Sequence, residues 1–234
     1  MTIALNGPRL PAAQGKADRL IVFCHGYGAD GNDLIGLGGE WQRAMPTAAF
    51  VSPNAPQPCA GAPMGYQWFP ISRLDPHEMM RGVESAAGIL NTFLDAELAR
   101  LGLDGSRLAL VGFSQGTMMS LHVGLRRKIA PAAIVGFSGA LTGPEKLPAE
   151  IQGRPPVLLI HGDADQMIPV QALNMAANGL AAAGVPVRWH ISHGIGHGIG
   201  PDGLELAGRF LVDAFAGKLS LKGDAGPIPA KTGG

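Results

Sequence analysis

Residues 108–116, Leu-Ala-Leu-Val-Gly-Phe-Ser-Gln-Gly, form the stretch from which the rest of the chain is best understood. The first four residues are an apolar run typical of a buried strand, and the spacing of Met118, Leu121 and Leu125 predicts a helix directly behind it. A serine held between a strand and a helix in a G-x-S-x-G turn is typical of a nucleophile elbow, in which a strained backbone exposes the hydroxyl. The pattern therefore predicts Ser114 as a nucleophile.

The glycines of this turn have a steric role. Gly112 and Gly116 are expected where the backbone and neighbouring elements come too close for a Cβ atom. The helix beginning beside Gln115 would direct its N–H groups toward the reaction centre and favour an oxyanion there. Because the chain contains 35 glycines, the motif alone is weak evidence and needs an acid and a base elsewhere in the sequence.

Composition narrows the class of protein. A chain of 234 residues with 46% apolar content suits one compact α/β domain. Eighteen basic residues balance eighteen acidic ones, so we expect no nucleic acid partner. Cys24 and Cys59 do not make a disulfide framework, and neither a signal peptide nor a membrane span is evident. We therefore expect a cytoplasmic protein without integral membrane association; oligomeric state stays open, with a homodimer among the choices.

Strand and helix patterns alternate along the chain. Apolar runs at 20–24, 48–51, 108–111, 132–135, 157–160 and 187–191 predict strands, and helices are expected at about 33–45, 75–101, 115–125, 169–184 and 201–215. This order predicts a mostly parallel central sheet with helices on both faces, and the proline-rich connection before 157 offers no large cap domain. We expect a single domain over 1–216 and a flexible C-terminal tail over 217–234.

Candidate acids and bases follow the two last predicted strands. A serine hydroxyl needs an imidazole to take its proton and a carboxylate to orient that imidazole. Asp163 and Asp165 follow the strand at 157–160, and His193 and His197 follow the strand at 187–191. Loops at the carboxyl ends of parallel strands meet at one edge of the sheet, so either acid and either histidine could meet Ser114 there.

Five segments together resemble the phospholipase/carboxylesterase family of α/β-hydrolases, which includes the acyl-protein thioesterases. They are His25-Gly26-Tyr27-Gly28-Ala29-Asp30-Gly31, Pro53-Asn54-Ala55-Pro56, Gly112-Phe113-Ser114-Gln115-Gly116, His161-Gly162-Asp163-Ala164-Asp165 with Ile168-Pro169, and Gly196-His197. The resemblance spans about residues 20 to 215. It implies an α/β-hydrolase fold and a serine hydrolase for a small-molecule ester or thioester with an apolar acyl group, needing no cofactor and no metal.

The resemblance also assigns roles within the motifs. It makes Ser114 the nucleophile, Asp165 the acid and His197 the base, and it places the oxyanion hole at the backbone N–H groups of Tyr27 and Gln115. The chain departs from many family members at Thr117-Met118, where a further Gly or Ala is common, and in its C-terminal tail.

The long loop at 52–74 is rich in proline but carries four large apolar side chains, Met64, Tyr66, Trp68 and Phe69. A loop of this length in a compact domain is usually functional. We expect it to pack over a pocket, and we predict these four side chains as the lining of the acyl-binding pocket; the alternative is that they pack under the loop as part of the core.

Other interpretations compete with these. Residues 26–31 also satisfy G-x-G-x-x-G after a strand, the dinucleotide-binding fingerprint, but the next strand ends without an acidic residue for a ribose. His193 and His197 have zinc-like spacing, yet the glycines between them oppose a helix. Ser138 stands in a partial echo of the elbow motif and is expected to be structural. A dienelactone-hydrolase-like or peptidase activity, or a non-catalytic binding protein of the same fold, remain alternatives, and fluorophosphonate labelling would separate enzyme from binding protein.

Overall fold

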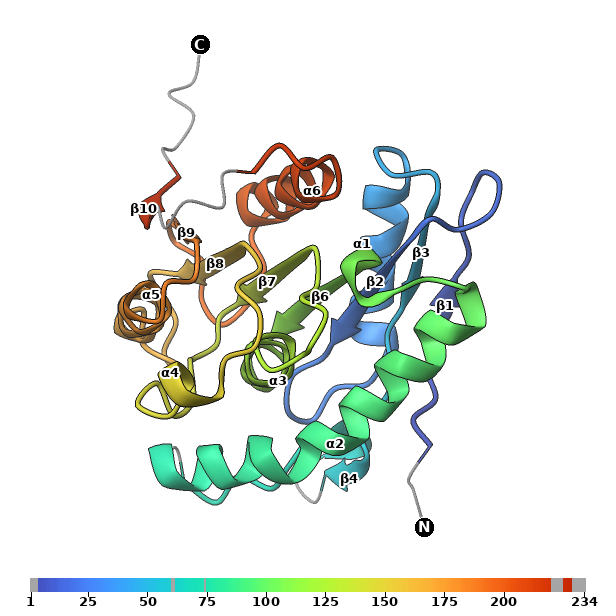
Figure 1. Ribbon diagram of the computed structural model, residues 1–234. Helices are drawn as coiled ribbons and strands as arrows, with labels where there is room; N and C mark the ends of the chain where they lie inside the picture. Colours follow the sequence, from blue (N-terminus) through green and yellow to red (C-terminus); the bar gives the residue numbers. More distant parts are fainter. Residues whose placement is uncertain (1–3, 60–61, 74, 220–224, 229–234) are drawn as a thin grey trace.

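The computed structural model describes residues 4–59, 62–73, 75–219 and 225–228. A central sheet has the strand order β1-β3-β2-β6-β7-β8-β9-β10, and every neighbouring pair is parallel except β1 with β3 (Figure 1). Its strands are β1 (Arg9–Leu10), β2 (Arg19–Cys24), β3 (Ala48–Val51), β6 (Leu108–Phe113), β7 (Ala133–Phe137), β8 (Val157–Gly162), β9 (Val187–Ser192) and β10 (Gly226–Pro227). The predicted mostly parallel sheet is confirmed.

Helices cover both faces of this sheet. They are α1 (Asn32–Gln42), α2 (Pro76–Leu101), α3 (Gln115–Gly124), α4 (Leu147–Glu150), α5 (Gln171–Ala182) and α6 (Pro201–Phe215), with a short 3₁₀ turn at Gly105–Arg107. Successive side chains of a strand point to opposite faces of the sheet, so alternate residues of one strand belong to the two different hydrophobic layers. In β2, Leu20 and Val22 belong to the layer with α2, α3 and α5, while Ile21 and Phe23 belong to the layer with α1 and α6.

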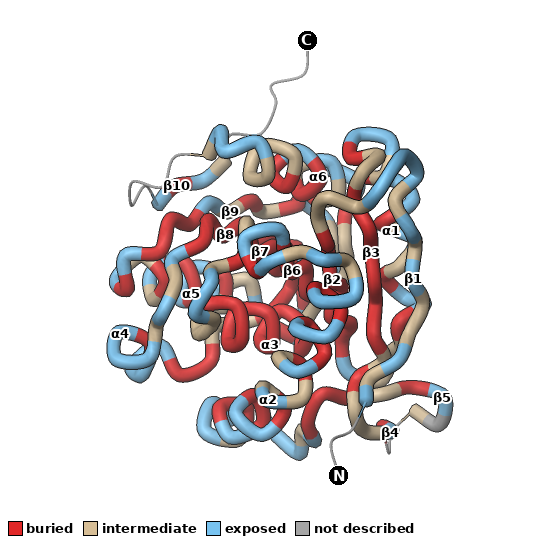
Figure 2. The backbone as a smooth tube through the Cα atoms, turned by 45° about the vertical axis from the view of Figure 1, so that its right-hand side comes forward, coloured by how far each residue is buried: buried red, intermediate tan, exposed pale blue. Residues whose placement is uncertain are grey.

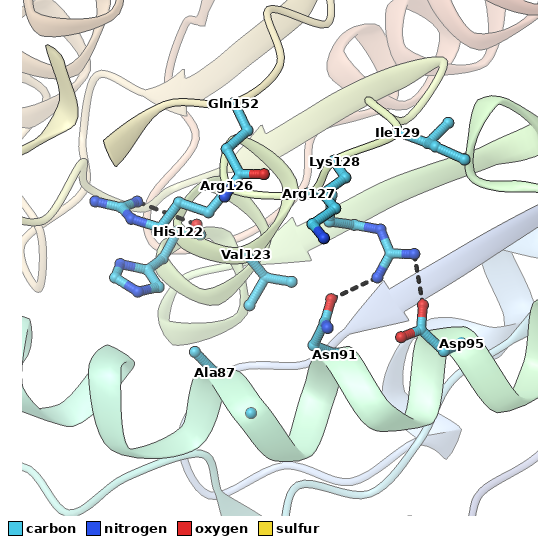
Figure 3. Close-up of a pocket in the computed structure, with 11 residues that line it drawn as sticks. Ala87, Asn91, Asp95, His122, Val123, Arg126, Arg127, Lys128, Ile129 and Gln152 are labelled. Atoms are coloured by element: carbon cyan, nitrogen blue, oxygen red, sulfur yellow. Dashed lines mark hydrogen bonds and ion pairs between the residues drawn. The ribbon is translucent and has the colours of Figure 1, made fainter. Parts of the chain in front are cut away.

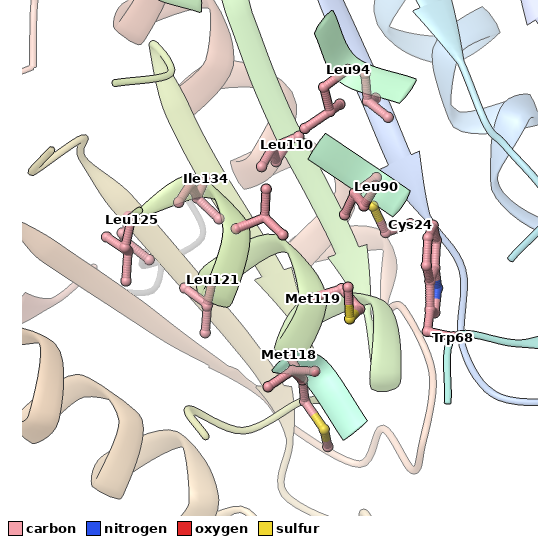
Figure 4. Close-up of a cluster of buried hydrophobic side chains, with 14 of the residues drawn as sticks. Cys24, Trp68, Leu90, Leu94, Leu110, Met118, Met119, Leu121, Leu125 and Ile134 are labelled. Carbon is pink, nitrogen blue, oxygen red and sulfur yellow. The ribbon is translucent and has the colours of Figure 1, made fainter. Parts of the chain in front are cut away.

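The larger of these layers surrounds α3, which is buried along its whole length (Figure 4). Met118, Met119 and Leu121 of α3 lie among side chains from α2 and from strands β2, β6 and β7. Figure 2 shows the same arrangement as buried backbone through the central strands and α3, with exposed segments at the periphery. A helix packed this tightly holds the residue at its N-terminus in a fixed position.

Four local features differ from the sequence-based expectation. A two-stranded hairpin, β4 (Gln57–Cys59) and β5 (Ala62–Gln67), occupies part of the loop at 52–74. The strand β1 and the single-turn helix α4 have too few residues to produce a recognisable period. In the expected tail, Gly226–Pro227 pair with β9 and the N–H of Ile228 donates to the carbonyl of Trp189 at 2.8 Å. Residues 220–224 and 229–234 of that tail lie outside the described residues.

Across the described ranges, no helix has both the length and the apolar character needed to cross a bilayer.

Candidate active site

The predicted elbow is present between β6 and α3. Ser114 has φ 53° and ψ −115°, a left-handed conformation that a side-chain-bearing residue rarely adopts and that costs about 1–3 kcal/mol. Its N–H donates to the carbonyl of Phe137 in the neighbouring strand at 2.9 Å. A Cβ atom at Gly112 would lie 2.4 Å from the carbonyl oxygen of Gly116, and one at Gly116 would lie 1.8 Å from that of Cys24. The expected steric roles of both glycines are therefore confirmed.

The two loops after β8 and β9 form two separate His–Asp pairs. Nδ1 of His197 lies 2.8 Å from Oδ2 of Asp165, and Nδ1 of His193 lies 2.8 Å from Oδ2 of Asp163. Burial distinguishes them: side-chain exposure is 14% for His197 and 0% for Asp165, against 85% for His193 and 37% for Asp163. Only the first pair is shielded from water, which strengthens its electrostatic interaction.

The buried carboxylate stays ionised. Burial by itself raises the pKa of Asp165, but hydrogen bonds from His197 and from the backbone N–H groups of Ile168 and Met167 outweigh it, so the pKa lies below its usual value. An ionised acid at this place can accept the Nδ1–H of His197, which leaves Nε2 of the imidazole as the proton acceptor.

Contacts at the elbow connect this pair to Ser114. The imidazole of His197 packs against the ring of Phe113, the residue before Ser114, with ring centroids 5.0 Å apart. On another side, a Cβ atom at Gly26 would lie 3.4 Å from Cβ of Ser114 and 3.0 Å from the Phe113 ring. The loop after β2 and the loop after β9 therefore both reach the elbow, the first at Phe113 and Ser114 and the second at Phe113.

The two residues predicted to supply N–H groups to an oxyanion hole are neighbours in sequence of residues at the elbow. Gln115 is the first residue of α3, so its N–H has no partner within the helix and lies at the positive end of the helix dipole. Tyr27 follows Gly26, which packs against Ser114. The loop bearing Tyr27 contacts the elbow through Gly26 and leads into α1, which begins at Asn32 with Gly31 as its N-cap.

Two side chains that the sequence analysis did not assign hold this region in place. His25 accepts the N–H of Ala55 at Nε2 (2.9 Å) and donates from Nδ1 to the carbonyl of Gly26 (2.7 Å); burial lowers its pKa, so the ring is neutral. The side-chain amide of Gln115 accepts the N–H of Trp68 and donates to the carbonyl of Phe69, both at 2.8 Å. In the sequence, the position of His25 directly before the glycine loop is the one feature that could have indicated its role.

The predicted acyl-pocket lining is wrong for two of its four residues. Trp68 and Phe69 are completely buried, and the indole N–H of Trp68 donates to the carbonyl of His25 at 3.0 Å. Met64 is 87% exposed, and Tyr66 is half-buried and forms a bridge with Ala29. Trp68 and Phe69 therefore pack into the core beside α2 and fill the space under the loop, whereas Met64 lines an open hollow together with Ala29 and Asp33.

An apolar cavity of about 530 Å³ lies on another side of the elbow. Met118, one turn along α3 from Ser114, and Ile168, three residues after Asp165, both line it. The other walls come from the start of α2, the segment after β7 and α5, and they include Met79, Met80, Leu141, Ala172 and Ala176. No sequence period marks this surface, since its residues come from five separate segments of the chain.

The basic run at the end of α3 faces away from this centre. Arg127 contacts Asn91 and Asp95 of α2, the second at 2.7 Å (Figure 3). Arg126 pairs with Glu150 at 2.6 Å. A cavity of about 540 Å³ between these groups lies at the C-terminal end of α3. The charges of both arginines are compensated by carboxylates, as in an ordinary helix end.

Thr117 is one of the two residues at which this chain departs from the family that it resembles. Its hydroxyl donates to the carbonyl of Phe137 at 2.8 Å. Cβ atoms at Gly136 and Gly139 would lie 2.5 and 2.4 Å from atoms of the Thr117 side chain, so these two glycines make room for it. Ser138, between them, has φ 45° and its hydroxyl lies 3.4 Å from the carbonyl of Gly198, beside His197.

Among the described residues, no group of three or more His, Cys, Asp or Glu side chains could hold a metal ion. Cys24 and Cys59 are buried free thiols, and burial raises the pKa of Cys24 to about 12.

Comparison with known proteins places this arrangement in a family. The family model described as Phospholipase/Carboxylesterase matches residues 5–214. Acyl-protein thioesterase 1 of Gibberella zeae is 28% identical over 221 residues, covering 87% of this chain and 94% of that protein. Esterase YpfH of Escherichia coli is 28% identical over 195 residues, covering 82% and 81%.

A solved structure agrees with these matches. The crystal structure of esterase PE8 is 47% identical, covers 91% of this chain and 100% of its own, and superposes with a TM-score of 0.88. The α/β-hydrolase fold expected from the sequence is thereby confirmed, and so is the resemblance on which the site residues were chosen. The chain belongs to the phospholipase/carboxylesterase family.

Proposed function

We propose that this protein is a serine hydrolase that cleaves carboxylic esters or thioesters with an apolar acyl group by way of an acyl-enzyme. Its family and its relatives named as esterases and thioesterases make it a carboxylic ester hydrolase. The observation that carries the finer proposal is the buried pair of His197 and Asp165 beside the strained Ser114.

In the first half of the reaction, the Ser114 hydroxyl oxygen attacks the acyl carbon and its proton passes to Nε2 of His197. Asp165 stabilises the imidazolium that forms, through its contact with Nδ1. The N–H groups of Tyr27 and Gln115 stabilise the negative charge on the carbonyl oxygen; one such donor is typically worth about 3 kcal/mol. Collapse of this intermediate breaks the bond to the alcohol or thiol, which leaves with the proton from His197.

In the second half, water attacks the acyl-Ser114 ester while His197 takes a proton from it. The oxygen of Ser114 recovers a proton from His197 as the acid product leaves, so the enzyme returns to its starting state. Every step uses groups of this chain and water, and none uses a metal or a cofactor.

The apolar cavity beside the elbow is the proposed place for the acyl group. It begins within one helical turn of Ser114 and is lined by methionines and aliphatic side chains. Methionine side chains adapt to ligands of different shape, which suits unbranched chains of several lengths. Each methylene group buried there contributes about 0.8 kcal/mol.

A panel of substrates tests the proposal. p-Nitrophenyl esters from acetate to decanoate, an acyl thioester and a lysophospholipid would be assayed with the protein and with His197→Ala as the blank. We expect hydrolysis of esters and thioester that improves from acetate to the medium chains, and a blank without turnover. No hydrolysis of any member, or an equal rate in the blank, would contradict the proposal.

A further inference from the structure

Both carboxylate oxygens of Asp165 have close neighbours. Oδ1 accepts the backbone N–H groups of Met167 and Ile168, both at 2.9 Å. Oδ2 has two imidazole neighbours, Nδ1 of His197 at 2.8 Å and Nε2 of His161 at 3.2 Å. The proposed mechanism uses only the first of these two histidines.

The protonation state of His161 follows from its second contact. Nε2 also lies 2.8 Å from the carbonyl oxygen of Ile168. A carbonyl oxygen can only accept, so Nε2 must carry a hydrogen, which is donated to that carbonyl, and the same nitrogen lies 3.2 Å from Oδ2 of Asp165. The side chain of His161 is 1% exposed and emerges from β8, a central strand, so its ring is fixed by the core.

These contacts close a short turn. The carboxylate of Asp165 binds the N–H groups of Met167 and Ile168, while the ring of His161 bridges that carboxylate and the carbonyl of Ile168. The rotamer of Asp165 that presents Oδ2 to His197 is therefore held from two directions, by the backbone of its own turn and by a strand of the sheet.

We infer that His161 is a positioning residue for the acid of the proposed triad: its Nε2–H orients Oδ2 of Asp165 toward His197 and shares the negative charge of that oxygen. The inference rests on the proposed function, since it assigns a role within that same site. It explains why a polar ring occupies a fully buried strand position surrounded by aliphatic side chains such as Leu159 and Leu173.

The effect of His161 on the basicity of His197 can be measured, and its sign can be predicted. Without the N–H of His161, the carboxylate would hold the His197 imidazolium more strongly, and the pKa of His197 would rise. Other titratable groups near this end of the sheet are Asp163 and His193, which bond each other on the exposed side, and Asp202, which bonds His190 and Ser192 of β9. Within the described structure, His197 and His161 are the two ionisable side chains within 4 Å of the Asp165 carboxylate.

The test compares His161→Phe, which removes the donor and keeps a ring, with His161→Gln, whose amide nitrogen can reach about the position of Nε2. The pH dependence of kcat/KM reports the base of the free enzyme. For His161→Phe we expect a kcat about tenfold lower and an apparent pKa of the base about half a unit to one unit higher. His161→Gln should restore most of both, and His193→Phe should leave the pKa unchanged.

Loss of activity in His161→Phe at an unchanged apparent pKa, or failure of His161→Gln to restore it, would mean that His161 only fills space and would overturn the inference. Circular dichroism melting checks that the variants fold. Should His161→Phe not fold, the unaltered protein still decides the matter: ¹⁵N NMR of its histidine rings must show a hydrogen on Nε2 of His161, and the Nδ1–H tautomer would overturn the inference.

The proposed function can fail separately. If His197→Ala keeps full esterase activity, the proposed function is wrong whatever His161 does. NMR titration of the His197 ring in Ser114→Ala, with and without His161→Phe, measures the same pKa change without any turnover. A higher value in the double variant supports the inference, and equal values contradict it.

Discussion

Nδ1 of His197 and Oδ2 of Asp165 lie 2.8 Å apart, and the carboxylate in this contact is completely buried. An equal distance separates His193 from Asp163 in the same pair of loops, but that contact is open to water. The two His–Asp pairs have similar geometry but differ in burial, so comparing them isolates the contribution of burial to the function of the pair.

Exchange of each acid for its amide tests that difference. Asp165→Asn removes the charge that stabilises the imidazolium and favours the wrong tautomer of His197, so kcat should fall by about 10³–10⁴-fold. Asp163→Asn alters an exposed contact and should keep kcat within about twofold. Steady-state kinetics on one chromogenic ester would measure both, and similar losses in the two variants would remove Asp165 from its proposed role.

The buried position of Phe69 gives a prediction about stability. A Cβ atom at Gly82 of α2 would lie 2.2 Å from the Phe69 ring, whereas one at Gly88 of the same helix meets nothing within 4 Å. Gly82→Ala should therefore lower the free energy of unfolding by about 1–3 kcal/mol. Gly88→Ala should raise it by up to about 1 kcal/mol because alanine favours helix. Urea unfolding distinguishes them, and an equal effect would show that Phe69 does not pack against α2.

The apolar cavity predicts a change in acyl-chain preference. Ala172 lines the cavity from α5, and Asn174 of the same helix is exposed and lies outside it. Ala172→Phe should fill the cavity and lower kcat/KM for p-nitrophenyl decanoate about tenfold relative to the acetate. Asn174→Phe should leave the ratio of the two substrates unchanged. A constant ratio in Ala172→Phe would place the acyl group elsewhere.

A buried histidine predicts how stability depends on pH. Burial, and then the charge of Arg126, lower the pKa of His122 to about 4, and its Nδ1 has no hydrogen-bond partner among the described residues. Below its ordinary pKa near 6.5 the unfolded chain binds a proton that the folded protein refuses, so stability present at pH 7 is lost as the pH falls toward 4. The shift corresponds to about 3 kcal/mol.

His122→Gln should remove this part of the pH dependence. The free energy of unfolding in urea would be measured at pH 7 and pH 4.5 for both proteins, since carboxylates contribute to the loss in each. We expect a smaller difference between the two pH values in the variant. Identical differences would mean that His122 titrates normally in the folded protein.

Much of the fold was predictable because central parallel strands are apolar on both faces. The continuous apolar runs at 20–24 and 108–111 predict buried strands, and the structure places both in the middle of the sheet. The strands β1 and β10, with two residues each, are defined by pairing with distant segments, and no local pattern predicts them.

Some residues of the candidate site could likewise be predicted from local sequence, and others could not. Ser114 was predictable from the elbow because strain and close approach leave a local signature of glycines. The choice of Asp165 over Asp163 rested on the resemblance, since only burial separates the two pairs. Trp68 and Phe69 were misassigned because an aromatic residue in a loop has the same sequence whether it lines a pocket or fills the core. The contacts of His161 depend on the turn that follows it, so no spacing rule would reveal them.

Fluorophosphonate labelling tests the central claim, that Ser114 is an activated nucleophile, most directly. Ser138 is the matched control, because it also has a positive φ and follows a neighbouring strand of the same sheet. Intact mass and peptide mapping should show one adduct on Ser114, the same adduct in Ser138→Ala, and none in Ser114→Ala. An unmodified wild-type protein, or an adduct that persists in Ser114→Ala, would contradict the account.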